Sequence, residues 1–141
     1  MTEGVRATGS CLCGAVRYEI RGPLRDVLIC HCVECRRWSG NVFAATSTLR
    51  EHLVLVELRG LRWAKSPASE SEARRGFCGE CGSSLFWDAP DRETISVAAG
   101  SLDEPTGLRL LGHVYVTQAG DYYELPDDGL PRHERLAGSP T

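Results

Sequence analysis

Residues 11–14 read Cys-Leu-Cys-Gly, and residues 78–82 read Cys-Gly-Glu-Cys-Gly. Cysteines spaced this closely in one turn can place both sulfur atoms on the same zinc ion, so the pattern predicts a zinc site. The alternative interpretation is that these cysteines are buried free thiols. A glycine after the second cysteine permits the positive φ that this turn often needs, and Gly14 and Gly82 stand there. Pairing the turns predicts a closed four-thiolate site that ties the start of the domain to its middle, formed by Cys11, Cys13, Cys78 and Cys81.

The other three cysteines form the cluster Cys30, Cys32 and Cys35. In an extended segment, Cys30 and Cys32 point to one face and His31 to the other, which makes His31 a poor fourth ligand. Three protein ligands with an open fourth position are the arrangement of catalytic zinc. The alternatives are a redox-active thiol pair and a second structural site completed by one of the histidines His52, His113 and His133.

Length and composition limit the possible classes of protein. The chain has 141 residues, which predicts one domain, and its 42% hydrophobic and 25% charged residues exclude a disordered or fibrous chain. No apolar run approaches the roughly 18–20 residues that cross a bilayer, and Met1–Ser10 lacks the apolar segment of a signal peptide. We therefore expect a cytoplasmic protein without a membrane partner, in which cysteines serve as metal ligands or catalytic thiols.

The net charge of −3 argues against nucleic acid as the main partner.

Apolar and polar residues alternate with a period of two in most of the chain, which predicts half-buried strands. In Ala15–Arg21, the residues Val16, Tyr18 and Ile20 share one face. The same pattern predicts six further strands: Val42–Ser47, Leu53–Leu58, Leu61–Ala64, Ser83–Trp87, Thr94–Ala99 and His113–Thr117. Many short strands with little helix favour an antiparallel β fold built from hairpins.

Two short helical turns are expected between these strands. Thr48 with Glu51 fits a capping box that opens a turn at Leu49–Leu53. A second turn follows Cys32 and ends near Gly40. Three aromatic residues are expected to belong to the core, namely Trp38, Phe86 and Trp87.

Five segments in order resemble the glutathione-dependent formaldehyde-activating enzyme family, which includes centromere protein V. They are GSCLCGAVRYEI from Gly9, CHCVECRRWSGN from Cys30, RRGFCGECGSSLFW from Arg74, AAGSLDEP from Ala98 and HVYV from His113. The resemblance implies a mainly β, zinc-stapled antiparallel β-tent related to zinc ribbons, with short helical turns. It covers residues 9–131, leaving an N-terminal lead at 1–8 and a flexible tail at 132–141.

The resemblance also implies two zinc ions per chain. One is structural and bound by Cys11, Cys13, Cys78 and Cys81. The other is catalytic and bound by Cys30, Cys32 and Cys35. The implied activity is that of a carbon–sulfur lyase, which forms or cleaves an adduct between a thiol, glutathione or a similar one, and a small aldehyde such as formaldehyde.

Four residues outside the cysteine clusters are candidates for substrate binding. Arg36 and Arg37 follow the second cluster, and guanidinium groups grip carboxylates in bidentate fashion. They would also offset the negative charge of three thiolates on one zinc ion. Asp103 and His113 are candidate proton carriers, although Asp103 also fits a turn cap.

Two other functions remain open from the sequence. One is a non-catalytic zinc module that binds another macromolecule. The other is a thiol-redox or zinc-buffer protein that uses Cys30, Cys32 and Cys35.

Overall fold

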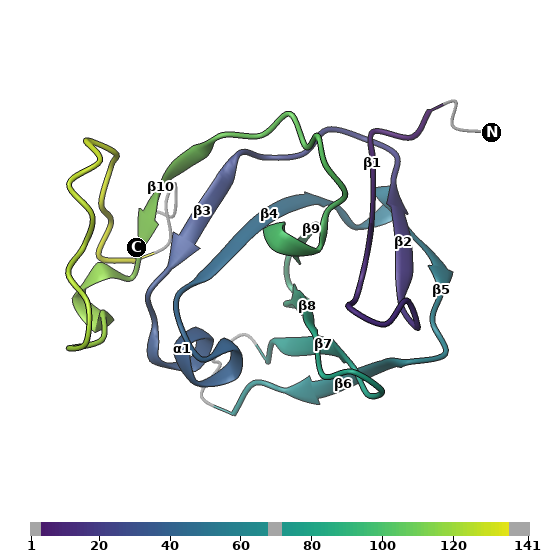
Figure 1. The fold of residues 1–141 in the computed structure, drawn as a ribbon, viewed down its shortest axis with the longest axis horizontal. Helices are drawn as coiled ribbons and strands as arrows, with labels where there is room; N and C mark the ends of the chain where they lie inside the picture. Colours follow the sequence, from purple (N-terminus) through teal and green to yellow (C-terminus); the bar gives the residue numbers. More distant parts are fainter. Residues whose placement is uncertain (1–3, 68–71, 136–141) are drawn as a thin grey trace.

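The chain folds into two β-sheets, with one short α-helix at the lower left of Figure 1. The computed structural model describes residues 4–67 and 72–135. The fold is mainly β with a few short helical turns, as the sequence predicts.

The smaller sheet contains three antiparallel strands in the order β1-β2-β5 and lies at the right of Figure 1. Its strands are β1 (Ala7–Ser10), β2 (Arg17–Ile20) and β5 (Leu53–Glu57). The turn between β1 and β2 carries Cys11 and Cys13.

The larger sheet has the order β10-β3-β4-β9-β8-β7-β6. All its neighbouring strands pair antiparallel except β10 and β3, which are parallel. The strands are β3 (Val27–Cys30), β4 (Phe43–Leu49), β6 (Leu61–Lys65), β7 (Arg74–Cys78), β8 (Ser84–Asp88), β9 (Thr94–Ala98) and β10 (Leu110–Val114). The antiparallel β fold that the strand pattern favours is therefore confirmed, with β10 and β3 as one parallel pair.

The helical turn expected after Cys32 is confirmed as α1 (Val33–Ser39), which ends at Gly40 with φ 86°. The turn expected near Leu49 is also present as η1 (Arg50–His52), but its predicted capping box is wrong. Thr48 lies on β4 and its hydroxyl donates to the carbonyl of Pro23 at 3.1 Å, so it is not free to cap a helix. Two more 3-10 turns are η2 (Ala99–Ser101) and η3 (Val116–Gln118).

Three observed strands, β1, β3 and β7, were not among those predicted. Their sequences, ATGS, VLIC and RRGFC, lack a clear alternation of apolar and polar residues. The predicted strand His113–Thr117 is shifted, because β10 ends at Val114. The next residue, Tyr115, has φ 56°, a left-handed conformation that no strand accommodates.

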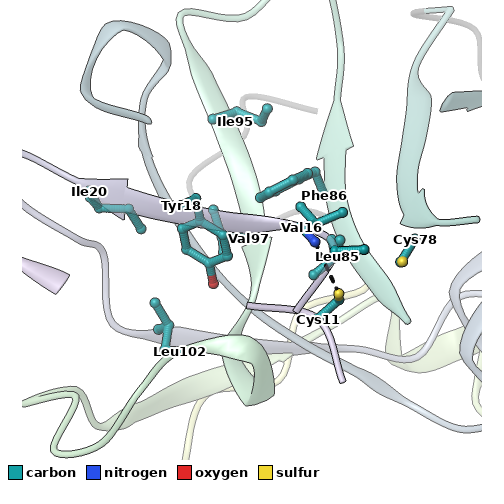
Figure 2. Packing of buried hydrophobic residues seen from close by; sticks show 11 residues of the cluster. Cys11, Val16, Tyr18, Ile20, Cys78, Leu85, Phe86, Ile95, Val97 and Leu102 are labelled. Carbon is teal, nitrogen blue, oxygen red and sulfur yellow. Dashed lines mark hydrogen bonds between the residues drawn. The ribbon is translucent and has the colours of Figure 1, made fainter. Parts of the chain in front are cut away.

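The main core lies between the two sheets and is drawn in Figure 2. Tyr18 and Phe86 pack edge to face with ring centroids 5.4 Å apart, and Phe86 is fully buried as predicted. Cys11 and Cys78 lie together at one side of this cluster, so the core continues into the cysteine turns (Figure 2). Of the predicted core tryptophans, Trp38 packs on a second cluster around Phe43, and Trp87 is half-buried.

The described part of each terminus is joined to the sheets. Arg6 donates its backbone N–H to Ile20 at 2.7 Å, and β1 begins one residue later. Near the other end, His133 donates to the carbonyl of His113 at 2.9 Å. The remainder of the predicted lead and tail, residues 1–3 and 136–141, lies outside the described residues. Within 4–67 and 72–135, no helix is long and apolar enough to cross a membrane.

Burial of Tyr18 predicts a loss of stability at high pH. Burial raises the pKa of this phenol from 10.0 to about 12. The neutral phenol stabilises the fold fully below pH 10, and this contribution is lost as the pH rises toward 12. We expect the free energy of unfolding to fall by about 1 kcal/mol between about pH 9 and pH 11 from this group.

The measurement is urea unfolding at each pH for the native protein and the Tyr18→Phe variant. The free energy of unfolding of the variant should decline less steeply with pH than that of the native protein, whatever the stability of the variant at pH 9. Identical slopes for the two proteins would contradict the assignment.

Candidate metal centres

The first cysteine group joins two turns that are far apart in the sequence. Cys11 and Cys13 come from the β1–β2 turn, and Cys78 and Cys81 come from the end of β7 and the turn that follows. Their four sulfur atoms all lie within 4.8 Å of one another. Two of the S–S distances, Cys11 to Cys13 and Cys13 to Cys78, are 3.8 Å. A tetrahedron with Zn–S bonds of about 2.3 Å has edges of about 3.8 Å, so this group fits zinc.

Backbone N–H groups donate to two sulfur atoms of this group and so orient them. Val16 donates to Cys11 Sγ at 3.2 Å. Glu80 and Cys81 donate to Cys78 Sγ at 3.4 and 3.5 Å. The positive φ predicted for both turns is confirmed, with 85° at Gly14 and 81° at Gly82.

The second group contains Cys30, Cys32 and Cys35, whose sulfur atoms also lie within 4.8 Å of one another. Cys30 is the last residue of β3, Cys32 is the N-cap of α1, and Cys35 lies in the first turn of α1. The chain thus turns from strand to helix around the three sulfurs, as the spacing indicates. Three thiols in this geometry can hold a soft cation such as zinc.

Cys32 is the thiol of this group that ionises most readily. Its sulfur accepts the backbone N–H of Cys35 at 3.3 Å. Hydrogen bonds from the side chains of Cys30 and Cys35, with that N–H, lower the pKa of Cys32 to about 2. The same contact with Cys32 raises the pKa of Cys30.

His31 lies between two of these cysteines in sequence, but its ring points into a separate buried network. Its Nε2 is 2.9 Å from Nδ1 of His113, and its Nδ1 is 2.8 Å from the hydroxyl of Tyr123. His113 Nε2 is in turn 2.8 Å from Asp128 Oδ2. Both ring nitrogens of each histidine are therefore occupied, so neither histidine offers a nitrogen to the cysteines.

This network attaches the C-terminal segment, residues 119–135, to the second cysteine group. Tyr123 and Asp128 belong to that segment, and Gln118 adds a contact by accepting the N–H of Val33 at 3.0 Å. The neighbouring His113 lowers the pKa of Asp128 from its ordinary value.

The other predicted substrate-binding residues are Arg36, Arg37 and Asp103, and they do not all lie beside the second cysteine group. Arg36 lies beside it, but donates to the carbonyls of His31 at 3.2 Å and Gln118 at 2.8 Å. Arg37 is exposed on α1. Asp103 accepts the hydroxyl of Thr8 at 2.6 Å and donates its N–H to the Thr8 carbonyl, contacts with β1 that support a structural role.

The structure adds one residue that the sequence analysis did not consider. Arg75 on β7 is 7% exposed, and its Nη1 lies 3.6 Å from Cys35 Sγ. Because β7 was not predicted as a strand, its alternation could not show which of Arg74 and Arg75 faces inward. Arg75 therefore places a positive charge in contact with Cys35, in addition to Arg36 beside the group.

The fold and the two groups define a β protein with one four-cysteine centre and one three-cysteine centre, both able to hold metal ions. The model of the family described as glutathione-dependent formaldehyde-activating enzyme matches residues 6–118. The chain belongs to this family.

Two other proteins are similar to this chain. An uncharacterized lyase of Schizosaccharomyces pombe is 32% identical over 79 residues, which cover 56% of this chain and 55% of that protein. The match thus spans about half the length of this curated relative. A crystal structure of a Rhodobacter sphaeroides protein has a TM-score of 0.59 at 25% identity, and the match covers 76% of this chain and 99% of that one.

The two cysteine groups should respond differently to substitution. Cys78 is fully buried in the main core, so Cys78→Ser should abolish metal binding by the first group and unfold the domain. Cys32→Ser should abolish metal binding by the second group but leave the fold intact. Native mass spectrometry counts the metal, and circular dichroism and urea unfolding report the fold. If Cys32→Ser unfolds the domain as Cys78→Ser does, then the second site is structural.

Proposed function

We propose that this protein is a zinc-dependent enzyme of the carbon–sulfur lyase type. It would form or cleave an adduct between a thiol, glutathione or a similar compound, and a small aldehyde such as formaldehyde. Membership of the family supports a glutathione-related aldehyde-adduct enzyme in general. The lyase name of the curated relative supports the reaction class.

One observation carries the proposal for the site. Among the residues that the structure describes, Cys30, Cys32 and Cys35 are not joined by a fourth cysteine, histidine or carboxylate. Zinc takes four ligands, so a ligand from outside this set would complete the centre. The nearest histidine in sequence is committed to His113 and Tyr123, which supports an external ligand.

A substrate thiol is well suited to that position because the centre already favours soft sulfur ligands. When bound, zinc would lower the pKa of such a thiol and present it as a thiolate near neutral pH. Such a thiolate sulfur would donate an electron pair to the carbonyl carbon of the aldehyde. A C–S bond forms, the C=O π pair moves to oxygen, and the oxygen takes a proton from solvent. The reverse sequence cleaves the bond.

The surrounding residues would position the substrates. Cys35 packs with Phe43 and Ala98, and Trp38 covers part of this cluster, so the sulfurs have an apolar neighbour on one side. Arg37 is the candidate for binding a substrate carboxylate, because it is exposed on the helix that carries Cys35. His113 would act on a proton only through its hydrogen-bonded partners, His31 and Asp128.

Native mass spectrometry during a glutathione titration tests the proposal. We expect two zinc ions per chain, with one lost or carrying a thiol adduct as glutathione is added. In parallel, ¹³C exchange spectroscopy with labelled formaldehyde and glutathione should show faster formation of the hydroxymethyl thioether than in buffer alone.

Cys32→Ser is the matched control, since it should keep the first zinc ion but lose both the thiol response and the rate increase. If two zinc ions stay bound and neither is lost nor gains a thiol adduct on titration, glutathione is excluded as the substrate. A single inert zinc ion would instead favour the non-catalytic interaction module. Reversible disulfide formation among Cys30, Cys32 and Cys35, with zinc released, would favour the redox or zinc-buffer protein.

A further inference from the structure

The guanidinium of Arg75 is buried against the three-cysteine group. Its three nitrogens each have a partner: Cys35 Sγ at 3.6 Å, Ser66 Oγ at 3.1 Å and Glu34 Oε1 at 3.4 Å. The charged plane also lies over the ring of Trp38, 5.0 Å from its centroid. These four contacts fix the orientation of the cation, with Nη1 directed at the Cys35 thiol.

A buried cation is costly unless negative charge compensates it. Glu34 provides one such charge on the same helix as Cys35. Three thiolates around one zinc ion provide another, because together they carry one excess negative charge. A thiolate as fourth ligand would add a further negative charge, and a buried cation in contact with the centre stabilises that state most.

The neighbouring arginine shows that this placement is particular to Arg75. Arg74 precedes it on β7 but faces the opposite side, where its side chain is 50% exposed. Arg74 binds Asp88 and stacks on Trp63 at 3.9 Å, and these contacts lie away from the cysteines. Arg74 and Arg75 therefore carry the same charged group but differ in where it lies, which makes Arg74 a matched control for Arg75.

We propose that Arg75 determines how readily the three-cysteine centre holds its metal and accepts a thiolate as the fourth ligand. It does so as a fixed positive charge in contact with Cys35. Glu34 opposes this effect by sharing the guanidinium charge. The role of the thiolate rests on the proposed function, whereas the effect on metal affinity does not.

The test compares Arg75→Gln with Arg75→Lys and with Arg74→Gln as matched control. Asp88 keeps Arg50 as a partner when Arg74 is replaced, so the control variant should fold. Metal affinity of the second site is measured by competition with a chromophoric chelator. Thiol binding is measured on the cobalt(II)-substituted protein, whose absorption distinguishes three thiolate ligands from four. The probe is 2-mercaptoethanol, which has no carboxylate that Arg75 could bind directly.

We expect Arg75→Gln to weaken metal binding at the second site by about tenfold to a hundredfold. It should also weaken binding of 2-mercaptoethanol, while Arg75→Lys keeps part of both affinities and Arg74→Gln resembles the native protein. Native affinities in a folded Arg75→Gln variant would overturn the inference and leave the proposed function standing. A native protein that takes no second metal or no thiol would instead refute the proposed function.

Glu34→Gln provides an independent test if Arg75→Gln fails to fold. Removing this carboxylate leaves more of the guanidinium charge directed at the centre, so the affinity for 2-mercaptoethanol should rise severalfold. If the Arg75–Glu34 pair had only a structural role, the affinity for 2-mercaptoethanol would fall in both Arg75→Gln and Glu34→Gln. A fall in thiol affinity on Glu34→Gln would therefore contradict the inference.

Discussion

The contact between the β1–β2 turn and the β7–β8 turn is the constraint on which the rest of the fold depends. The strands are only four to seven residues long, so each buries little apolar surface by itself. Four sulfur atoms lie together where these turns meet, although Cys13 and Cys78 are 65 positions apart in the sequence. Cys11 and Cys78 also belong to the main core, so the same side chains serve as packing residues and as candidate ligands. A metal ion bound there would favour the folded chain, because the unfolded chain has no preformed site.

The second cysteine group lies where several segments meet that are distant in sequence. β3 and α1 supply the thiols, β7 supplies Arg75, and β10 with the C-terminal segment supplies the network around His31. The parallel pairing of β10 with β3 makes this meeting possible, because it places Val114 beside Cys30. Among the described residues, the first group is served by its own two turns: backbone N–H groups donate to Cys11 and Cys78, and the Ser83 hydroxyl contacts Cys81. This contrast in surroundings is the reason to propose a structural role for one group and a reactive role for the other.

Local sequence patterns predicted much of the fold. The helical turn that ends at Gly40 and the strand around Tyr18 follow from rules that involve only neighbouring residues. The errors occurred where distant partners decide the outcome. β7 has no regular alternation, and it forms because β6 and β8 pair with it on both sides. Thr48 has the sequence of a helix cap, but a contact with Pro23 occupies its hydroxyl.

The sequence by itself determined which residues can act as metal ligands and how they divide into two groups, because cysteine spacing limits which sulfurs one ion can reach. It also determined the positive φ at Gly14 and Gly82, since a turn of this kind requires it locally. Only the tertiary structure decided which charge faces the thiols and which groups occupy the rings of His31 and His113. These contacts cross β7, β10 and the C-terminal segment, and such pairings depend on the register of the whole sheet, which no local pattern of residues encodes.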